Sequence, residues 1–326
     1  VAAHTSGFDA LADIVKNYSP DKVAAICGIP ADAIVQAARW FGASEASLSL
    51  YCQGLNQSAH GTHNNAGIIH LHLATGQIGK PGAGPFSLTG QPNAMGGREV
   101  GGLSNLLSAH RDLANPEHRA EVARLWGIPE VPAKPGKAAV NLFQALKTGE
   151  IKAVWIACTN PVQSLPNQAA VREALQAAEY VVVQETYGNT DTAAYADLLL
   201  PASGWGEKHG TVTNSERCIT RVQSAFQAPG EARHDWEIVV DFARRLGHRL
   251  GRTDAERLFP YGDAESIFNE HRESTRGRDL DITGLSYALL DARGPQQWPF
   301  PEGADAGKIR LYEDGRFPTA DGKARF

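Results

Sequence analysis

Hydrophobic positions recur at helical spacing in two stretches near the start of the chain. The first stretch contains Phe8, Leu11, Ile14 and Val15, and the second contains Ile34, Ala37, Ala38 and Phe41. A short apolar run at 47–53 predicts a strand, and the spacing after it predicts a helix over about 59–76. We therefore expect residues 1–45 to form a helical lead-in segment.

The middle of the chain has the pattern of a strand–helix–strand unit. Continuous apolar runs predict strands at 153–158 and 180–183, with a helix at 168–178 between them. A unit of this kind implies parallel strands joined by a right-handed crossover. A third strand is predicted at 198–200, where Pro201 ends it.

A long amphipathic helix is predicted from Asp235 to about residue 250. Its inward side chains are expected to be those of Ile238, Val239, Phe242 and Leu246. The sequence then becomes polar, and residues 292–326 are rich in glycine, proline and charge, which predicts an extended segment. We therefore predict an α/β fold: a parallel-sheet, Rossmann-like nucleotide-binding domain over 46–252 with flanking helices, then a polar helical and extended wrapping segment over 253–326.

Composition narrows the class of protein. The 326 residues are 42% hydrophobic and 21% charged, which excludes a disordered or collagen-like chain and allows a sizeable core. No apolar run is long enough for a membrane span, and a net charge of −5 argues against a surface for nucleic acid. The chain begins at Val1 and has one methionine, Met95, so we expect it to be a piece of a longer protein.

The four cysteines do not suggest a metal site. Cys27, Cys52, Cys158 and Cys218 form no CxxC pair for zinc or iron–sulfur binding. A disulfide framework is not expected in a chain of this size, which favours a reducing, cytoplasmic setting. We expect at least three of the four to be small buried side chains. The histidines between residues 60 and 72 are expected to be surface or supporting groups, so no residue is predicted to ligate a metal.

Glycine is concentrated between residues 54 and 102, which hold 12 of the chain's 33 glycines. Glycine permits positive φ angles and close backbone approach, so this density is typical of loops that pack tightly against something. The segment also carries Asn93, Met95, Arg98 and Glu99, which a low-complexity linker would lack. We favour a ligand-lining loop over a flexible linker.

Polar residues follow the strands of the strand–helix–strand unit. The first strand is followed by Thr159 and Asn160, and the second ends in Gln184 and Glu185. Ligands of open α/β sheets bind at the carboxyl ends of the strands, where an acidic residue accepts hydrogen bonds from a ribose or a purine. The phosphate fingerprint GxGxxG is missing, so an ordinary NAD dehydrogenase is a poor fit and a nucleotide bound in another manner stays open. The polar loop at 201–218 offers groups for a phosphate or base edge, with a solvated surface loop as the alternative.

Three segments resemble the molybdopterin oxidoreductase superfamily. They are LTGQPNAMGGREVGG (88–102), CTNPVQSLPN (158–167) and ADLLLPASGWGEKHGTVTNSER (196–217). The first is the most discriminating and is similar to the nitrate reductases. Its Met-Gly-Gly-Arg-Glu form resembles the assimilatory branch, as do GPQQWPFPEG (294–303) and RLYEDGRFPTADGKARF (310–326). The resemblance extends over essentially the whole chain.

The resemblance implies a molybdenum ion held between two molybdopterin guanine dinucleotides, and a 4Fe-4S cluster in the full-length protein that this chain does not ligate. The family's pattern places cofactor contacts on seven residues: Gln53, Gln57, Asn160, Gln184, Glu185, Lys208 and Asp235. Asp235 suits the two-donor edge of guanine and is also placed to cap the long helix. The chain departs from the family twice, with Glu185 where relatives usually have Asp and with Cys218 where they usually have a second arginine.

The resemblance further implies reduction of nitrate to nitrite by oxygen-atom transfer to molybdenum. Nitrate is a small planar anion, so its site needs a fixed cation. Arg98 matches the family's active-site arginine and is our candidate; the alternative is that it pairs with Glu99 or a phosphate and merely holds the loop. Met95 is expected to line the substrate funnel, with plain packing as its alternative.

The expected partners are nitrate, the remaining domains of the same polypeptide and an electron-donor protein or domain. The cluster cysteines and the molybdenum-ligating cysteine are expected before Val1 and a pterin-closing domain after Phe326, so we expect the isolated chain to fold but not to reduce nitrate. Three other interpretations stay open: a formate dehydrogenase of the same superfamily, a non-catalytic structural subunit of an electron-transfer complex, and a stand-alone nucleotide-binding module.

Overall fold

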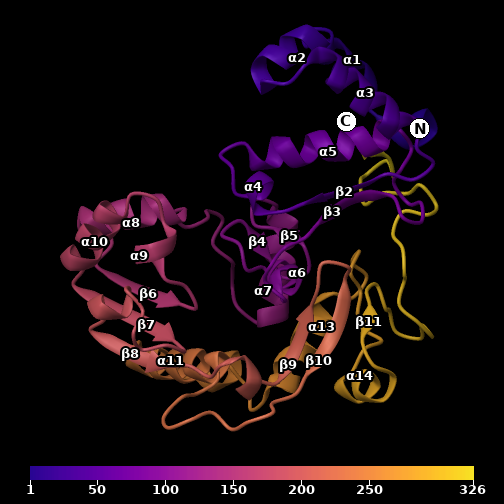
Figure 1. The fold of residues 1–326 in the computed structure, drawn as a ribbon. Helices are drawn as coiled ribbons and strands as arrows, with labels where there is room; N and C mark the ends of the chain where they lie inside the picture. Colours follow the sequence, from indigo (N-terminus) through magenta and orange to yellow (C-terminus); the bar gives the residue numbers. More distant parts are fainter.

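The computed structural model describes residues 1–326, and its N-terminal group of elements places helices around a two-stranded sheet (Figure 1). In chain order the group contains α1 (Phe8–Val15), α2 (Pro20–Cys27), α3 (Ala31–Ala43), β2 (Leu48–Tyr51), α4 (Gln53–Asn56), α5 (Gly61–Ala74) and β3 (Gly84–Ser87). Strands β2 and β3 are parallel, with Leu48 opposite Gly84. No residue of α1, α2, α3 or β2 is fully buried.

The centre of the molecule is formed by short elements at the end of the glycine-rich segment and just after it. These are α6 (Ala94–Glu99), β4 (Leu106–Leu107), β5 (Arg111–Asp112) and α7 (Pro116–Trp126). Asn115 caps α7 by accepting the backbone N–H groups of Glu117 and His118, and Pro116 occupies the first helical position. A small core forms where β4 and α7 meet, around the fully buried Val122.

The predicted strand–helix–strand unit is present. It consists of α8 (Ala139–Lys147), β6 (Ala153–Ala157), α9 (Pro161–Ser164), α10 (Gln168–Ala177), β7 (Tyr180–Glu185) and β8 (Leu198–Pro201). The three strands are parallel in the order β6-β7-β8. Alternate residues of β7, Val181 and Val183, join Leu146 and Leu175 from α8 and α10 in one core, so the two helices cover one face of the sheet.

The last group surrounds an antiparallel sheet. It contains η3 (Trp205–Glu207), β9 (Gly210–Thr213), β10 (Cys218–Val222), α11 (Asp235–Arg249), α12 (Ala255–Leu258), α13 (Ala264–Ser274), α14 (Tyr287–Arg293) and β11 (Gln296–Gln297). The strand order is β11-β10-β9. Ile219 of β10 packs with Phe268, Leu285 and Phe300 in the largest core of the molecule.

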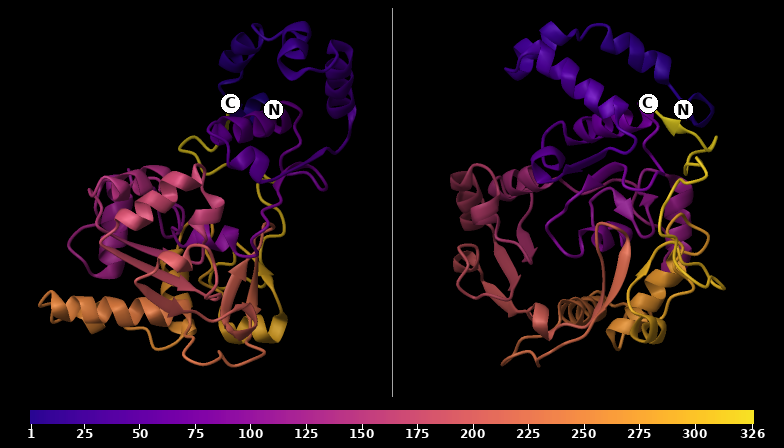
Figure 2. Two further views of the ribbon diagram at one scale, coloured as in Figure 1. Left: turned by 60° about the vertical axis from the view of Figure 1, so that its left-hand side comes forward. Right: turned by 45° about the vertical axis from the view of Figure 1, so that its right-hand side comes forward.

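The C-terminal segment after α14 has no further helix and returns to the start of the chain (Figure 2). Its last strand, β12 (Ala324–Arg325), pairs in parallel with β1 (Thr5–Ser6). Arg217 holds the segment by donating to the backbone carbonyls of Trp298, Lys308 and Ile309. The residues after α14 thus run back to the start of the chain without a further helix, and the Arg217 side chain is used to hold them.

Two expectations about burial are wrong. None of the four cysteines is buried, because each lies at or just beyond the end of a helix or strand: Cys27 and Cys158 are exposed, and Cys52 and Cys218 are partly exposed. In α11, Ile238 is buried, but Val239, Phe242 and Leu246 are 48%, 48% and 43% exposed. The sheet that α11 covers has only three strands, and the helix extends past it, so part of its apolar face finds no partner in this chain.

The observed architecture is thus an α/β fold with small parallel sheets. No helix combines the length and apolar character that crossing a membrane requires. The predicted division at residues 45 and 252 stays a prediction.

Candidate functional site

Four side chains meet at the carboxyl edge of the β6-β7-β8 sheet. Gln184 Nε2, at the end of β7, donates to Asp235 Oδ1 at 2.7 Å, and Lys208 Nζ lies 2.5 Å from Asp235 Oδ2. The Cys158 thiol, directly after β6, lies 3.5 Å from Asp235 Oδ1. We call Cys158, Gln184, Lys208 and Asp235 the Asp235 cluster. It joins two strand ends, a loop and the first residue of α11.

The charges of the Asp235 cluster follow from its contacts. Burial tends to raise the pKa of Asp235, but hydrogen bonds from Lys208 and Gln184 outweigh it and hold this pKa below its ordinary value. Partial desolvation of the thiol and the neighbouring Asp235 carboxylate raise the pKa of Cys158 to about 11. At neutral pH, Asp235 is therefore ionised and Cys158 is a neutral thiol.

The Asp235 cluster has features of a ligand site. Gln184 is 2% exposed, yet its Oε1 atom has no hydrogen-bond partner, which is uncommon for a buried polar atom. Cys158 has a φ of 58°, a conformation rare for residues other than glycine and often found at functional sites. The N-terminus of the 15-residue helix α11 and the Lys208 ammonium favour an anionic group. These residues fit a ligand that brings both hydrogen-bond donors and an anionic group.

Two other predicted residues lie at the same sheet edge but bond elsewhere. Glu185 Oε1 accepts the backbone N–H groups of Thr186 and Tyr187, at 2.7 and 3.4 Å. Asn160 Oδ1 accepts the backbone N–H and the hydroxyl of Thr192, at 3.2 and 2.6 Å. Asn160 thus braces the turn after β6, and neither side chain bonds to the Asp235 cluster.

Gln53 and Gln57 lie at either end of α4 in the N-terminal group. Gln53 Nε2 donates to Gln91 Oε1 at 3.2 Å, while Gln57 is exposed. Neither residue forms a hydrogen bond or an ion pair with the Asp235 cluster. In Figure 1 the arrowheads of β6 and β7 point toward the middle of the molecule, where α6 lies.

Arg98 and Met95 both lie on α6. Arg98 forms no ion pair or hydrogen bond through its guanidinium, and its charge partly offsets the burial that raises the pKa of Tyr51. The predicted alternative of an Arg98–Glu99 pair is absent, because Glu99 accepts hydrogen bonds from Thr213 and Trp298 instead. Met95 packs against the largest core, so its alternative role in packing is present.

The sequence reasoning missed Cys158 as a member of the site, because it treated the cysteines as packing residues. Its position directly after an apolar strand, beside Thr159 and Asn160, was the available signal. Thr213 and Trp298 were missed as well, since no sequence spacing links them to Glu99.

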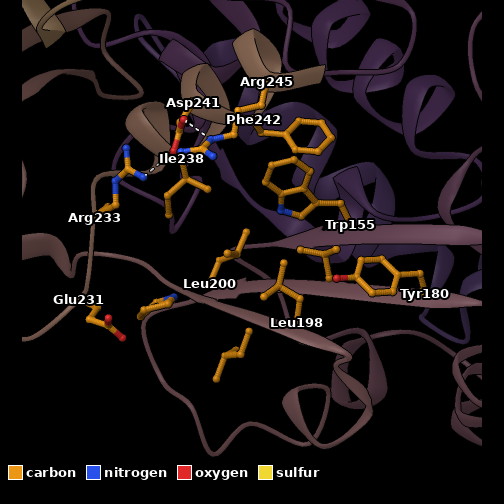
Figure 3. A pocket seen from close by; sticks show the side chains of 13 residues that line it. Trp155, Tyr180, Leu198, Leu200, Glu231, Arg233, Ile238, Asp241, Phe242 and Arg245 are labelled. Carbon is orange, nitrogen blue, oxygen red and sulfur yellow. Dashed lines mark hydrogen bonds and ion pairs between the residues drawn. The ribbon is translucent and has the colours of Figure 1, made fainter. Parts of the chain in front are cut away.

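A separate apolar hollow of about 500 Å³ lies between the sheet and α11 (Figure 3). Trp155, Leu198 and Leu200 face Phe242 across it, and Trp155 and Phe242 pack edge to face at 4.8 Å. Its two arginines, Arg233 and Arg245, are both paired with Asp241. The hollow contains none of the predicted site residues and offers no free cation, so the Asp235 cluster and Arg98 remain the candidate site.

The chain belongs to the molybdopterin oxidoreductase family, whose sequence model matches residues 11–245. The chain also shares its fold with the acetylene hydratase from Pelobacter acetylenicus, which superposes on 99% of the chain with a TM-score of 0.63 at 19% identity, over 44% of its own length.

Three curated proteins show which members of the family the chain resembles. The chain is 44% identical to the nitrate reductase of Synechocystis sp. over 99% of this chain and 45% of that protein. It is 36% identical to the assimilatory nitrate reductase catalytic subunit of Bacillus subtilis, over 99% of this chain and 44% of that protein. Formate dehydrogenase H of Escherichia coli is 30% identical, over 100% of this chain and 44% of that protein. The chain therefore spans less than half the length of these relatives.

Proposed function

We propose that the chain is the part of a molybdenum-dependent nitrate reductase that binds nitrate and holds the pterin cofactor. The reaction takes nitrate, two electrons and two protons to nitrite and water. The nitrate reductases of Synechocystis and Bacillus subtilis, 44% and 36% identical, support this substrate over formate. The observation that carries the proposal is Arg98, a guanidinium without a protein partner on the glycine-rich segment.

Arg98 supplies what a nitrate site needs. A guanidinium is planar and presents paired N–H donors that match a planar oxyanion. Its charge is not neutralised by Glu99, so it is available to hold nitrate and to stabilise the negative charge that grows as the N–O bond breaks. Met95 on the same helix is partly exposed, and the part of its side chain that does not pack against the largest core lines the approach. The molybdenum cofactor, when bound, supplies the two-electron chemistry.

We further infer that the cofactor is the bis(molybdopterin guanine dinucleotide) form and that the β6-β7-β8 unit acts as a Rossmann-like nucleotide-binding domain. The parallel sheet and the polar edge at the ends of β6 and β7 support this inference. Asp235 accepts the guanine N–H donors, Lys208 and the N-terminus of α11 hold phosphate, and Gln184 Oε1 takes a further donor. Gln53, Gln57, Asn160 and Glu185 would complete the cofactor contacts, and a 4Fe-4S cluster held by residues outside this chain would supply electron transfer.

The cellular role and location of the enzyme are inferred from the same relatives. We place it in nitrate assimilation in the cytoplasm, with an electron-donor protein or domain and the remaining domains of the polypeptide as partners. The assimilatory relative from Bacillus subtilis supports this placement. Cell fractionation with an antibody against the chain tests it, and recovery in the periplasm would contradict it.

The substrate is tested by a viologen-coupled assay on the complete polypeptide that carries this chain, loaded with molybdenum cofactor. Arg98→Ala is expected to lower kcat/KM for nitrate about 100- to 1000-fold, because a fixed charge donor at the reacting anion is lost. Arg39→Ala, on the exposed part of α3, is the matched control and is expected to change nothing. Formate oxidation in place of nitrate reduction, or full activity of Arg98→Ala, would contradict the assignment.

The cofactor site is tested on the chain itself with GDP as the probe, by calorimetry. Asp235→Asn is expected to weaken GDP binding about 10- to 100-fold, since a charge-assisted pair of hydrogen bonds to guanine becomes a neutral contact. Asp13→Asn, on the surface of α1, is the matched control. Equal GDP affinity of the chain and Asp235→Asn would count against the site.

A further inference from the structure

Helix α6 carries Met95 and Arg98 but has little stability of its own. It is six residues long, contains Gly96 and Gly97, and lacks a side-chain cap at its N-terminus. Glycine is a poor helix former, and helices this short do not persist in water without tertiary contacts. The direction in which Arg98 points must therefore be set by residues outside the helix.

One residue of β9 contacts both ends of α6. The backbone N–H of Thr213 donates to Asn93 Oδ1 at 2.9 Å, just before the helix. The hydroxyl of Thr213 donates to Glu99 Oε2 at 2.9 Å, at the last residue of the helix. The indole Nε1–H of Trp298 donates to the other carboxyl oxygen of Glu99.

These contacts are buried and tightly packed. Glu99, Thr213 and Trp298 are 2%, 5% and 5% exposed. The backbone N–H of Ala109 also donates to the Glu99 carbonyl at 2.7 Å. A Cβ atom at Gly96 would lie 2.1 Å from Asn93 Oδ1, so glycine is required there for Asn93 to reach Thr213.

We propose that Glu99, held by Thr213 and Trp298, is a positioning residue that fixes the rotation of α6 and so aims Arg98 at the substrate. Adjacent residues of a helix point about 100° apart. With the Glu99 side chain pinned into the core, the Arg98 side chain is turned away from it and left without a protein partner. We call Glu99, Thr213 and Trp298 the Glu99 anchor; its aiming role rests on the proposed nitrate site.

The Glu99 anchor acts through the geometry of its hydrogen bonds and not through charge, since no cation pairs with the Glu99 carboxyl group. Burial raises the pKa of Glu99, and the hydrogen bonds from Thr213 and Trp298 only partly oppose this. An uncharged side chain of the same shape can serve as well. Glutamine keeps an oxygen to accept the Trp298 N–H and gains an N–H₂ group to donate to the Thr213 hydroxyl.

The anchor is tested first on the chain by hydrogen exchange of residues 93–102. Thr213→Val keeps the shape but removes the hydroxyl, and is expected to speed this exchange about tenfold. Thr213→Ser, which keeps the hydroxyl, is expected to stay within about twofold of the unchanged chain. Exchange in β6 and β7 is the internal control for folding. Equal exchange of the Val and Ser variants would overturn the anchor.

A second pair of variants keeps the test decisive if Thr213→Val does not fold. Glu99→Gln is expected to leave the exchange of 93–102 unchanged, while Trp298→Phe, which keeps a ring but loses the N–H donor, is expected to speed it several-fold. A Glu99→Gln variant that exchanges as fast as Trp298→Phe would show that the charge, and not the hydrogen-bond geometry, holds the helix.

The aiming role is then tested in the complete, cofactor-loaded polypeptide. Thr213→Val is expected to raise KM for nitrate about tenfold with a smaller change in kcat, while Thr213→Ser and Glu99→Gln keep both values and the pH profile. An unchanged KM in Thr213→Val, together with loss of activity in Arg98→Ala, would overturn the anchor and leave the nitrate site standing. Full activity of Arg98→Ala would instead overturn the nitrate site, whatever the exchange experiment shows.

Discussion

The N-terminal group and the β6-β7-β8 unit differ in how completely they bury their apolar side chains. In the β6-β7-β8 unit, eight side chains from three helices and two strands form one buried core around Leu146 and Val183. In the N-terminal group, α1, α2, α3 and β2 bury no residue fully, although their apolar spacing is as regular. Ile26 and Trp40 are 66% and 68% exposed.

The difference shows that apolar periodicity decides which segments become helices but not whether the apolar face is covered. In a strand–helix–strand unit the helix and the strands bury each other's apolar side chains, because the crossover packs the helix against the strands that it connects. The sheets of the N-terminal group have only two strands each, and among its helices only α5 carries fully buried side chains, those of His72 and Leu73. The two regions are therefore expected to differ in local stability.

The largest expected effect is in hydrogen exchange of the unchanged chain. Amides of β6 and β7 are expected to exchange at least about 100-fold more slowly than those of α1, α2 and α3, because elements with few buried contacts open locally at low free energy. Mass spectrometry of peptic fragments measures this. Equal protection in both regions would show that the N-terminal helices are as stable as the β6-β7-β8 unit.

Matched substitutions are the next largest effect. Leu146→Ala, at a fully buried position, is expected to lower the free energy of unfolding by about 2 to 5 kcal/mol. Ile26→Ala, at a 66% exposed position, is expected to change it by less than about 0.5 kcal/mol. Urea unfolding of both variants checks the pair. A loss of more than 2 kcal/mol in Ile26→Ala would show that α2 is better packed than its exposure indicates.

Acid is expected to destabilise α5, the best-buried helix of the N-terminal group. His72 is fully buried and bonds Ser49 through Nε2, and burial lowers its pKa below the ordinary value of 6.5. A lowered histidine pKa means that its contribution to stability is complete above pH 6.5 and is lost as the pH falls through the folded value. Exchange of α5 is therefore expected to speed up below pH 6.5 relative to β6 and β7.

The pH effect has its own control. His72→Gln, which stays neutral at every pH, is expected to abolish the acid-induced exchange of α5, while His63→Gln, at an exposed position, is expected to keep it. The same acid response in both variants would assign it to another group.

The smallest expected effect is at the surface of α1. Asp13 pairs with Lys16 at 2.6 Å, and both side chains are more than 70% exposed. Asp13→Ala is expected to change the free energy of unfolding by less than about 0.5 kcal/mol, because solvent screens such pairs. A larger loss of unfolding free energy, measured by thermal or urea unfolding, would indicate that the stability of the protein depends on α1 more than its exposed surface suggests.

The sequence predicted the local elements well where one pattern dominated. The predicted strand at 153–158 is β6, the helix at 168–178 is α10, and the helix from Asp235 is α11, each within a residue of its bounds. It missed α2, since Val23, Ala24 and Ile26 form too short an apolar stripe to stand out. These successes have a common reason: helix and strand formation depend on neighbours a few positions away.

In the candidate site, too, the positions of residues along the chain could be predicted from the sequence, but their long-range contacts could not. The sequence alone placed Gln184 at a strand end, Asp235 at a helix start and Arg98 in a glycine-rich segment, because each position depends on local pattern. It could not give the bond of Gln184 to Asp235, 51 residues apart, or that of Glu99 to Thr213, 114 residues apart. Nor could it show that the cysteines stay unburied or that α11 leaves apolar side chains exposed. Burial and long-range hydrogen bonds depend on which surfaces meet, and only the tertiary structure decides that.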